Sequence, residues 1–205
     1  MTAKNLKRNL GFTLVELLIV IGLLGAIALI VIAAINPIEQ ANRARDTRFK
    51  SDGAQLISAI DRYFASRQSF PWVPDIATNN DSPFGFVSAT NYGVGICDDP
   101  AAEGCEADGF LLDTDELKSE FRNRDFIDTT VEADMLYIGK ASETSSSVYA
   151  CFVPASKATR EKACVEEKVY TLNANGTRTD IVFATCDGAA GTDWTTNLWS
   201  VCVPE

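Results

Sequence analysis

An almost unbroken apolar stretch, residues 11–35, constrains this chain more than any other feature. It reads GFTLVELLIVIGLLGAIALIVIAAI and carries one charged residue, Glu16, close to its start. As an α-helix, the segment from Phe12 to Ile35 would be roughly 36 Å long at about 1.5 Å per residue, enough to cross the hydrocarbon core of a bilayer. The stretch is therefore predicted to be a single membrane-spanning helix.

Glu16 does not fit a simple membrane anchor. A carboxylate inside a membrane helix costs on the order of 2.5 to 3.5 kcal/mol. The alternative, a side chain that reaches back to the lipid headgroups, would make Glu16 incidental. We favour a Glu16 that has a partner and a role.

The eleven residues before the apolar run, MTAKNLKRNLG, form a short basic head that is expected to stay in the cytoplasm. Three interpretations compete: an uncleaved anchor, a secretory peptide cut near the A-x-A tripeptide at 26–28, and a leader cut on the cytoplasmic side. The secretory peptide is disfavoured, because the apolar run continues from Leu29 to Ile35 and Glu16 would lie at the head of its core.

Gly11 followed by FTLVELLIVIGLLGAIA resembles the N-terminus of type IV prepilins and the related pseudopilins. In that family a prepilin peptidase cuts after the glycine, the new terminal phenylalanine is N-methylated, and the apolar helix is retained. The resemblance implies cleavage between Gly11 and Phe12 and methylation of Phe12. It also implies that Glu16 faces the α-amino group of a neighbouring subunit. That pair would set the register of adjacent helices, because either charge alone would be buried without a partner.

Gly22 and Gly25 lie in the middle of the predicted helix, where each costs about 1 kcal/mol relative to alanine. One interpretation is close packing of helices. The resemblance implies another, local unwinding during assembly. Relatives often carry a proline in the later part of this run, whereas this chain has none before Pro37.

The segment 36–66 is predicted to continue as an amphipathic helix with one buried face. Pro37 would either kink the helix or begin a new one at its first turn. The apolar positions follow at steps of three and four: Phe49, Gly53, Leu56, Ile60 and Phe64, widened by Ile57 and Tyr63. A single helix over 12–66 would be roughly 80 Å long, the long N-terminal helix of the pilin architecture.

A basic run, residues 43–50, follows the apolar stretch and holds Arg43, Arg45, Arg48 and Lys50. A solvated helix face is the favoured interpretation; pairing with acids of adjacent subunits is the alternative. The chain as a whole has a formal charge of −10, and removal of the leader with its three cations would leave −13. This balance argues against a nucleic-acid-binding protein, while a role in DNA uptake stays open.

All six cysteines follow the apolar stretch, as expected for disulfides in an oxidising compartment outside the membrane. Six cysteines allow 15 pairings. We predict pairing of nearest neighbours, 97 with 105, 151 with 164 and 186 with 202, because each pair brackets a hairpin or loop. Zinc is disfavoured, since the spacing is wide and the sequence has no histidine. The residues are Cys97, Cys105, Cys151, Cys164, Cys186 and Cys202.

Residues 67–205 are expected to form one globular head, with an irregular connector over about 67–134 and the sheet and disulfide region over about 135–205. No cofactor is expected. Calcium is the one cofactor left open, by an acidic cluster that lacks the EF-hand pattern and is better explained as a solvated loop. The cluster is Asp98, Asp99, Glu103, Glu106 and Asp108. A short helix around 116–122, capped by Asp113 or Thr114, is also predicted.

Four segments are predicted to be strands of an antiparallel sheet: 135–139, 147–153, 168–172 and 180–185. Asn175-Gly176 marks a turn between the last two. The fold class is therefore α+β and type IV pilin-like, with a long N-terminal helix packed on a disulfide-stapled sheet. The Trp and Tyr side chains could form an adhesive or sugar-binding surface, but core packing is favoured.

No catalytic pattern is present, since the sequence contains no histidine and neither phosphate-binding glycine motif. The chain is therefore not expected to be an enzyme. The resemblance implies a structural subunit of a type IV pilus-like filament, made in the cytoplasmic membrane, cut by prepilin peptidase and extruded by the pilus assembly machinery for adhesion, surface motility or DNA uptake. Alternatives are a pseudopilin of a secretion or competence system and, from another class, an anchored or secreted binding domain.

Overall fold

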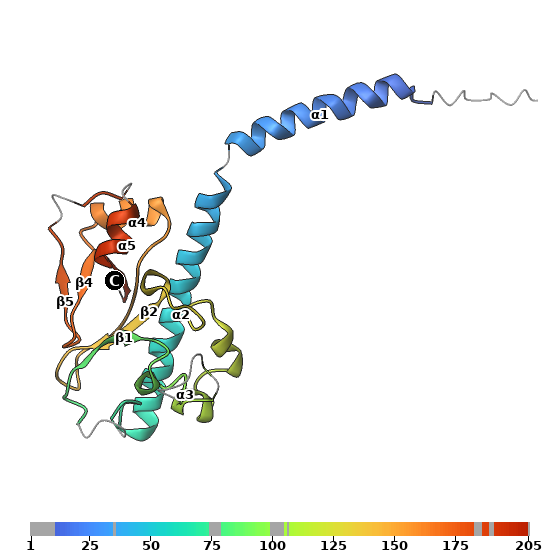
Figure 1. Ribbon diagram of the computed structural model, residues 1–205. Helices are drawn as coiled ribbons and strands as arrows, with labels where there is room; N and C mark the ends of the chain where they lie inside the picture. The colour runs from blue at the N-terminus through green and yellow to red at the C-terminus, as the bar shows by residue number, and fades with distance from the viewer. Residues whose placement is uncertain are drawn as a thin grey trace, which may run out of the picture. The chain divides into compact units, whose positions relative to one another are not determined.

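The computed structural model describes residues 11–34, 36–73, 79–98, 105, 107–182, 186–188 and 191–204. The chain divides into two units, Met1–Ile38 and Glu39–Glu205. Figure 1 shows the elements of each unit, and the two are described separately below.

The first unit contains helix α1, Leu14–Ala34. The predicted helix over 12–35 is confirmed within these bounds, and Ile35 lies outside the described residues. α1 runs unbroken through Gly22 and Gly25, and a Cβ atom added at either glycine would meet nothing within 4 Å. Neither glycine is therefore required by packing within one chain.

Helix α2, Pro37–Arg67, begins at the proline. At the first helical position its missing N–H costs no hydrogen bond, so Pro37 starts a helix. Asn36, just before it, is not helical, so the structure describes two helices where the sequence predicts one over 12–66. The predicted stripe is confirmed: Phe49, Gly53, Leu56, Ile60 and Tyr63 are buried, with Ile57 and Phe64 half-buried.

The head is built on a four-stranded antiparallel sheet in the order β1-β2-β3-β6. Its strands are β1 Phe84–Ser88, β2 Leu136–Lys140, β3 Val148–Phe152 and β6 Val201–Val203. A separate hairpin pairs β4, Tyr170–Leu172, with β5, Arg178–Asp180. Gly176 forms its turn at φ +74°, as Asn175-Gly176 predicts. The antiparallel sheet is thus confirmed, although β1 lies in a segment predicted to be irregular. The strand predicted over 180–185 shares only Asp180 with β5, residues 181–182 are not in a strand, and residues 183–185 lie outside the described residues.

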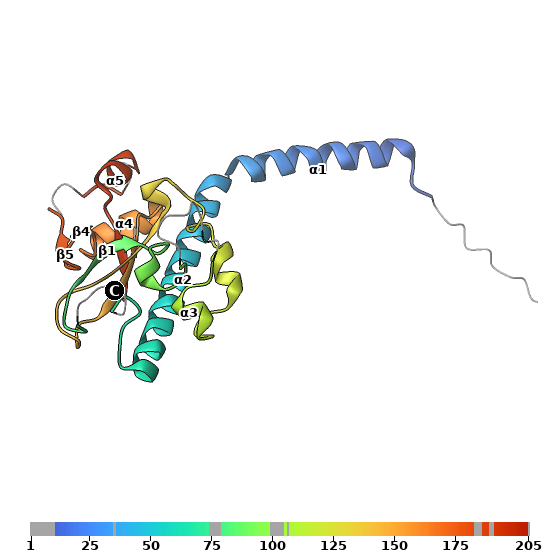
Figure 2. The same cartoon turned by 60° about the horizontal axis from the view of Figure 1, so that its bottom comes forward.

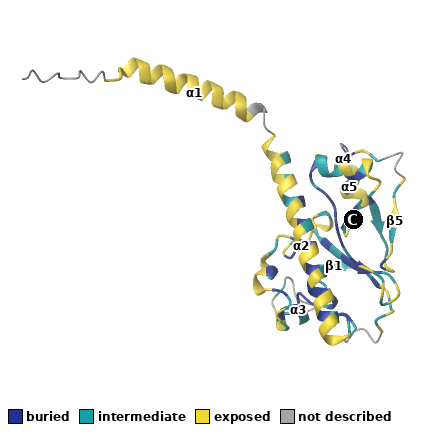
Figure 3. Ribbon diagram, turned by 180° about the vertical axis from the view of Figure 1, so that it is seen from behind, coloured by how far each residue is buried: buried dark blue, intermediate teal, exposed yellow. Residues whose placement is uncertain are grey.

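Helix α2 lies between this sheet and the segment 110–134, as both views show (Figures 1 and 2). On the sheet side, a Cβ at Gly53 would come within 2.9 Å of the Ala150 Cβ, so the glycine allows the close approach. On the other side, Phe49 meets Phe126 edge-on at 5.7 Å between ring centroids. Burial on both sides explains the wide apolar stripe of α2, which Figure 3 shows as dark blue positions.

The tryptophans Trp72 and Trp194 belong to the core, where they are 2% and 0% exposed. Trp72 lies in a column of stacked rings between Phe70 and Phe84, at centroid distances of 4.7 and 4.4 Å. Trp199 is half-buried and meets Trp194 edge-on at 5.8 Å. These rings support the core interpretation over a surface for adhesion.

Short helices complete the head: η1 Tyr92–Val94, α3 Phe110–Asp113, η2 Ser119–Asn123, η3 Glu132–Asp134, α4 Lys157–Val165 and α5 Gly191–Asn197. The predicted helix at 116–122 is wrong in its start and cap. Asp113 ends α3, Thr114 follows it as the C-cap, and the next helix begins at Ser119. The Leu111 N–H donates to the Gly95 carbonyl at the start of α3. The Leu117 N–H donates to the Leu111 carbonyl, six residues earlier, which is a loop contact and not the bond of an α-helix.

The disulfides join Cys97 to Cys105, Cys151 to Cys202 and Cys164 to Cys186. Only the first of the three predicted pairs is correct. Cys151 of β3 lies directly opposite Cys202 of β6 in the sheet register, with 4.0 Å between their Cα atoms. The register of two strands distant in sequence therefore decides this pair, which leaves Cys164 at the end of α4 for Cys186.

Two acids of α2 hold the loop that leads into α4. The Asp46 carboxylate accepts hydrogen bonds from the N–H groups of Ala155, at 2.9 Å, and Ser156, at 3.0 Å. The Glu39 carboxylate accepts from the Ser156 hydroxyl at 3.0 Å and from the N–H groups of Lys157 and Ala158, both at 3.1 Å. Glu39 thereby binds the N-terminus of α4 from another element, where a negative charge is favoured.

These contacts shift the titration of Glu39. Burial acts to raise the pKa of Glu39, but the N–H groups of Ala158 and Lys157, the Ser156 hydroxyl and Arg43 outweigh it and lower the pKa to about 2. The folded state therefore gains stability from ionised Glu39. This gain is complete above pH 4.5, the ordinary pKa of the group, and is lost as the pH falls from 4.5 towards 2.

We predict that removal of Glu39's charge removes an acid-sensitive component of stability. Glu39→Gln should lower the free energy of unfolding by about 1 kcal/mol at pH 7, as expected for loss of a helix cap. The difference from the wild type should shrink between pH 4.5 and 2, as measured by urea unfolding. Burial raises the pKa of Asp52, and hence shifts stability in the opposite direction, in both proteins. A difference that stays constant over this pH range would contradict the assignment.

The disulfides should differ in their contributions to stability. In the chain-entropy model, the link of 151 to 202 contributes about 4 kcal/mol and the link of 97 to 105 about 2.5 kcal/mol, because the first closes a longer loop. Replacing both members of each pair with alanine, followed by thermal unfolding, should give this order. Non-reducing peptide mapping should recover 151 joined to 202, and a peptide joining 151 to 164 would refute the pairing.

Candidate functional site

The predicted cleavage site lies in exposed, non-helical chain just before α1. Gly11, Phe12 and Thr13 precede the first helical residue, Leu14, and all three are exposed. The Phe12 side chain is 85% exposed. A peptidase needs an accessible peptide outside regular structure, and the Gly11–Phe12 bond meets that requirement.

Glu16 lies in the first turn of α1, where it forms a reciprocal cap with Thr13. The Thr13 N–H and the Thr13 hydroxyl each donate to Oε2 of Glu16 at 2.8 Å. The Glu16 N–H donates back to the Thr13 hydroxyl oxygen at 3.2 Å. This is the capping box, in which the first residue and the acid three positions later satisfy each other's backbone donors.

The cap gives Glu16 a defined place at the start of the helix. Its carboxylate lies beside the exposed N–H groups of the first turn, where a negative charge is favourable. Both Thr13 donors reach the same oxygen, Oε2, so the cap does not need Oε1. The carboxylate can therefore keep its cap while Oε1 accepts a hydrogen bond from another group, such as an α-amino group.

Thr13 was not singled out from the sequence, although a signal was present. The residues Thr13-Leu-Val-Glu16 have the T-x-x-E spacing of a capping box directly before an apolar run. Glu16 therefore has a local role, as the partner of Thr13 in the cap, besides the expected pairing with an α-amino group. The two roles are compatible, because they use different oxygens.

The remaining surface of α1 is apolar on every side. Leu14–Ile32 is long and apolar enough to cross a membrane. Its large side chains are exposed, from 48% at Val20 to 80% at Leu14, and Figure 3 shows α1 in the colour of exposed residues as far as its burial is described, to Ile32. A helix without a polar face must be covered by lipid or by other protein. One apolar N-terminal helix of this kind fits membrane anchoring.

The basic run after α1 has partners within the same chain. Arg43 pairs with Glu39 at 3.2 Å, Arg45 with Asp134 at 2.8 Å, and Arg48 with Asp125 at 3.4 Å. Arg45 also lies over the Phe49 ring, at 4.5 Å from its centroid. The pairs of Arg45 and Arg48 attach α2 to the segment 125–134, whereas the Arg43 pair lies within α2, so these three arginines have partners without a second subunit.

The acidic cluster is only partly described. Asp99, Glu103 and Glu106 lie outside the described residues, whereas Asp98 and Asp108 lie within them. Asp108 pairs with Arg122 at 3.1 Å. In the part of the chain that the structure describes, no group of three His, Cys, Asp or Glu residues could hold a metal ion.

The model of the prokaryotic N-terminal methylation motif matches residues 6–32. The match contains Gly11, Phe12, Thr13 and Glu16 and confirms that the N-terminus is a type IV prepilin-type signal. Comparisons with curated proteins and with solved structures gave no match. The described fold, with helical N-terminus, antiparallel sheet and disulfides, is type IV pilin-like, as the resemblance implied.

The capping box between Thr13 and Glu16 leads to a prediction that does not follow from membrane anchoring by α1 alone. Thr13→Ala should weaken the first turn of α1 by about 1 kcal/mol, because the cap is lost. Exchange of the Glu16 and Leu17 amides, which donate to Thr13, should become about fivefold faster in the unprocessed chain in detergent micelles. Thr13→Ser keeps both donors and should match the wild type. Equal exchange in the alanine and serine variants would contradict the cap.

Proposed function

We propose that this chain, which begins with a type IV prepilin-type signal, is a structural subunit of a pilus-like filament. The observation that carries the proposal is the combination found in α1: an apolar surface on all sides and one carboxylate at its exposed start. A permanent lipid anchor would need the first feature but not the second. Assembly of many copies through α1 accounts for both.

In the proposed pathway, the chain is first held in the cytoplasmic membrane by α1, with residues 1–11 on the cytoplasmic side. Prepilin peptidase cuts after Gly11, and Phe12 receives the methyl group. The inner-membrane assembly machinery then moves α1 out of lipid and against the α1 helices of other copies. Glu16 of one copy pairs with the α-amino group of Phe12 in the next.

The head has the features of a domain that works outside the cell. Three disulfides suit an oxidising compartment, and the charge of −13 that remains after cleavage keeps the exposed surface acidic. We propose that its work is done by polymerisation rather than by catalysis, in adhesion, surface motility or DNA uptake. A pseudopilus of a secretion or competence system would use the same contacts in a shorter filament.

Processing gives the first test. The mature chain should begin with N-methyl-Phe12 and lack residues 1–11, as read by mass spectrometry of the N-terminal peptide. Inactivating the prepilin peptidase should leave the intact chain in the membrane fraction. An N-terminus at Leu29, or an unprocessed Met1 in cells with active peptidase, would refute the proposed pathway.

Assembly gives the second test, because Glu16 should be needed for filaments and not for the head. Glu16→Gln keeps the shape of the side chain but removes its charge, so the register pair is lost. Filaments sheared from the surface should fall by at least tenfold in electron micrographs, which corresponds to about 1.4 kcal/mol per contact. Thermal unfolding of the head should be unchanged. Normal filaments from this variant would overturn the role of Glu16.

A further inference from the structure

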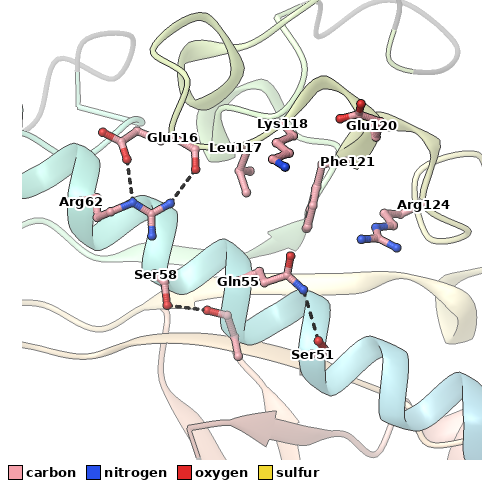
Figure 4. A pocket seen from close by; sticks show the side chains of 11 residues that line it. Ser51, Gln55, Ser58, Arg62, Glu116, Leu117, Lys118, Glu120, Phe121 and Arg124 are labelled. Carbon is pink, nitrogen blue, oxygen red and sulfur yellow. Dashed lines mark hydrogen bonds and ion pairs between the residues drawn. The ribbon is translucent and has the colours of Figure 1, made fainter.

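A groove of about 490 Å³ runs beside α2 on the side away from the sheet (Figure 4). One wall is α2 and the other is the segment 116–124. The groove follows α2 from position 51 to position 62, about 16 Å at the helical rise. Its lining is Ser51, Ala54, Gln55, Ser58 and Arg62 from α2, and Glu116, Leu117, Lys118, Glu120, Phe121 and Arg124 from the facing segment.

The shape of the groove suits a chain segment better than a small ion. Leu117 and Phe121 are 8% and 4% exposed and form an apolar part of the wall. The α2 side offers Ser51, Ala54 and Ser58, which are small. A length of three helical turns can receive several residues of an extended or helical segment.

One end of the groove is closed to further ionic contacts. Arg62 Nε donates to Oε2 of Glu116 at 2.8 Å, and Arg62 Nη2 donates to the Glu116 carbonyl at 2.6 Å. Figure 4 shows both bonds between α2 and the facing segment. The Arg62 guanidinium is already paired with Glu116, so it holds the facing segment against α2.

The other end presents donors without acceptors. Lys118 points towards α2, whereas the Glu120 carboxylate points away from it (Figure 4), and Lys118 forms no ion pair within the described part of the chain. Arg124 reaches Asp52 through Nη2 at 3.4 Å, but its Nε atom is buried and has no hydrogen-bond partner among the described residues. The Arg124 side chain as a whole is 40% exposed, so an incoming carboxylate can pair with the exposed part of this cation, although the buried Nε atom is out of its reach.

We propose that this groove receives a carboxylate-bearing segment from a second copy of the chain. The inference rests on the proposed filament, in which copies lie side by side. Each mature copy carries a net charge of −13, so a neighbour brings many carboxylates to the part of the groove that presents the cations Lys118 and Arg124. Pairing at Lys118 and Arg124 would relieve this repulsion between heads as well as fill the groove.

Zero-length cross-linking tests the contact directly. A carbodiimide activates a carboxylate, and the Lys118 amine then forms an amide with it and releases the urea by-product. In sheared wild-type filaments we expect a product of twice the subunit mass, in which Lys118 is joined to an Asp or Glu of the same sequence. Lys118→Arg should abolish this link and keep the filaments, because arginine retains the charge but does not react.

Charge reversal tests the energetics. Lys118→Glu should lower filament yield about threefold or more at low salt, in line with the modest worth of an exposed ion pair. Lys162→Glu, the same charge change on α4, is the matched control and should assemble as the wild type does. Thermal unfolding and disulfide mapping of each variant establish that the heads are folded.

The outcomes separate this inference from the proposed function. Wild-type filaments in which Lys118 gives no link, with normal yield from Lys118→Glu, would overturn the groove contact and leave the filament intact. A link from Lys118 to a different protein would also overturn it, because the occupant would not be a second copy. Absence of wild-type filaments would overturn both.

Discussion

The apolar surface of α1 cannot remain in water, and the rest of the molecule depends on that constraint. Fifteen large apolar side chains between Phe12 and Ile32 are exposed in the single chain. Burial of each is worth about 1.5 to 3 kcal/mol, so burial of all of them is worth more than the whole stability of a typical domain, about 5 to 15 kcal/mol. A helix of this kind needs a second environment, and the head must fold without it. The division of the chain at Ile38 agrees with this requirement.

Both lipid and a bundle of identical helices can cover the apolar surface of α1. Apolarity alone therefore does not favour the assembled state over the membrane-anchored state. Lipid tails are as apolar as leucine, and moving a helix from lipid into protein gains little from the hydrophobic effect. A carboxylate changes this balance. In lipid it costs about 2.5 to 3.5 kcal/mol, part of which the Thr13 cap offsets. In the proposed filament the amine of Phe12 supplies the opposite charge, so Glu16 favours the assembled state and one register within it.

Local patterns were predictable from the sequence. The stripe of α2 follows from residues three and four apart, its start follows from Pro37, and the Asn175-Gly176 turn follows from the left-handed backbone that glycine accepts. Gly11, Phe12 and Glu16 could be singled out because a motif, which the family model also matches, holds them within six positions. Thr13 could have been found by the same means, since its partner is three residues away.

Features that depend on distant partners were not predictable. The pairing of Cys151 with Cys202 is set by the register of β3 against β6, across 51 positions. β1 lies among residues typical of turns and becomes a strand because it pairs with β2, with an irregular register between Phe84 and Val87. Asp46, 2% exposed, appears on the helix as one more charged residue. Its partners come from residues 155 and 156, which nothing near Asp46 indicates.

The position of α2 allows one helix to support the head and, in the proposed filament, to contact a second copy. Its sheet side is fixed by apolar contacts and by the close approach at Gly53, which tolerate little change. Its charged contacts with the facing segment differ in exposure. Asp52, which pairs with Arg124, is only 7% exposed, whereas the pair of Arg48 with Asp125 is exposed, at 65% and 78% for the two side chains. Such pairs contribute about 0 to 1 kcal/mol each to stability. An exposed pair of this kind can therefore change partners at little cost to the fold, whereas the same change repeated in every copy of the proposed filament would add up.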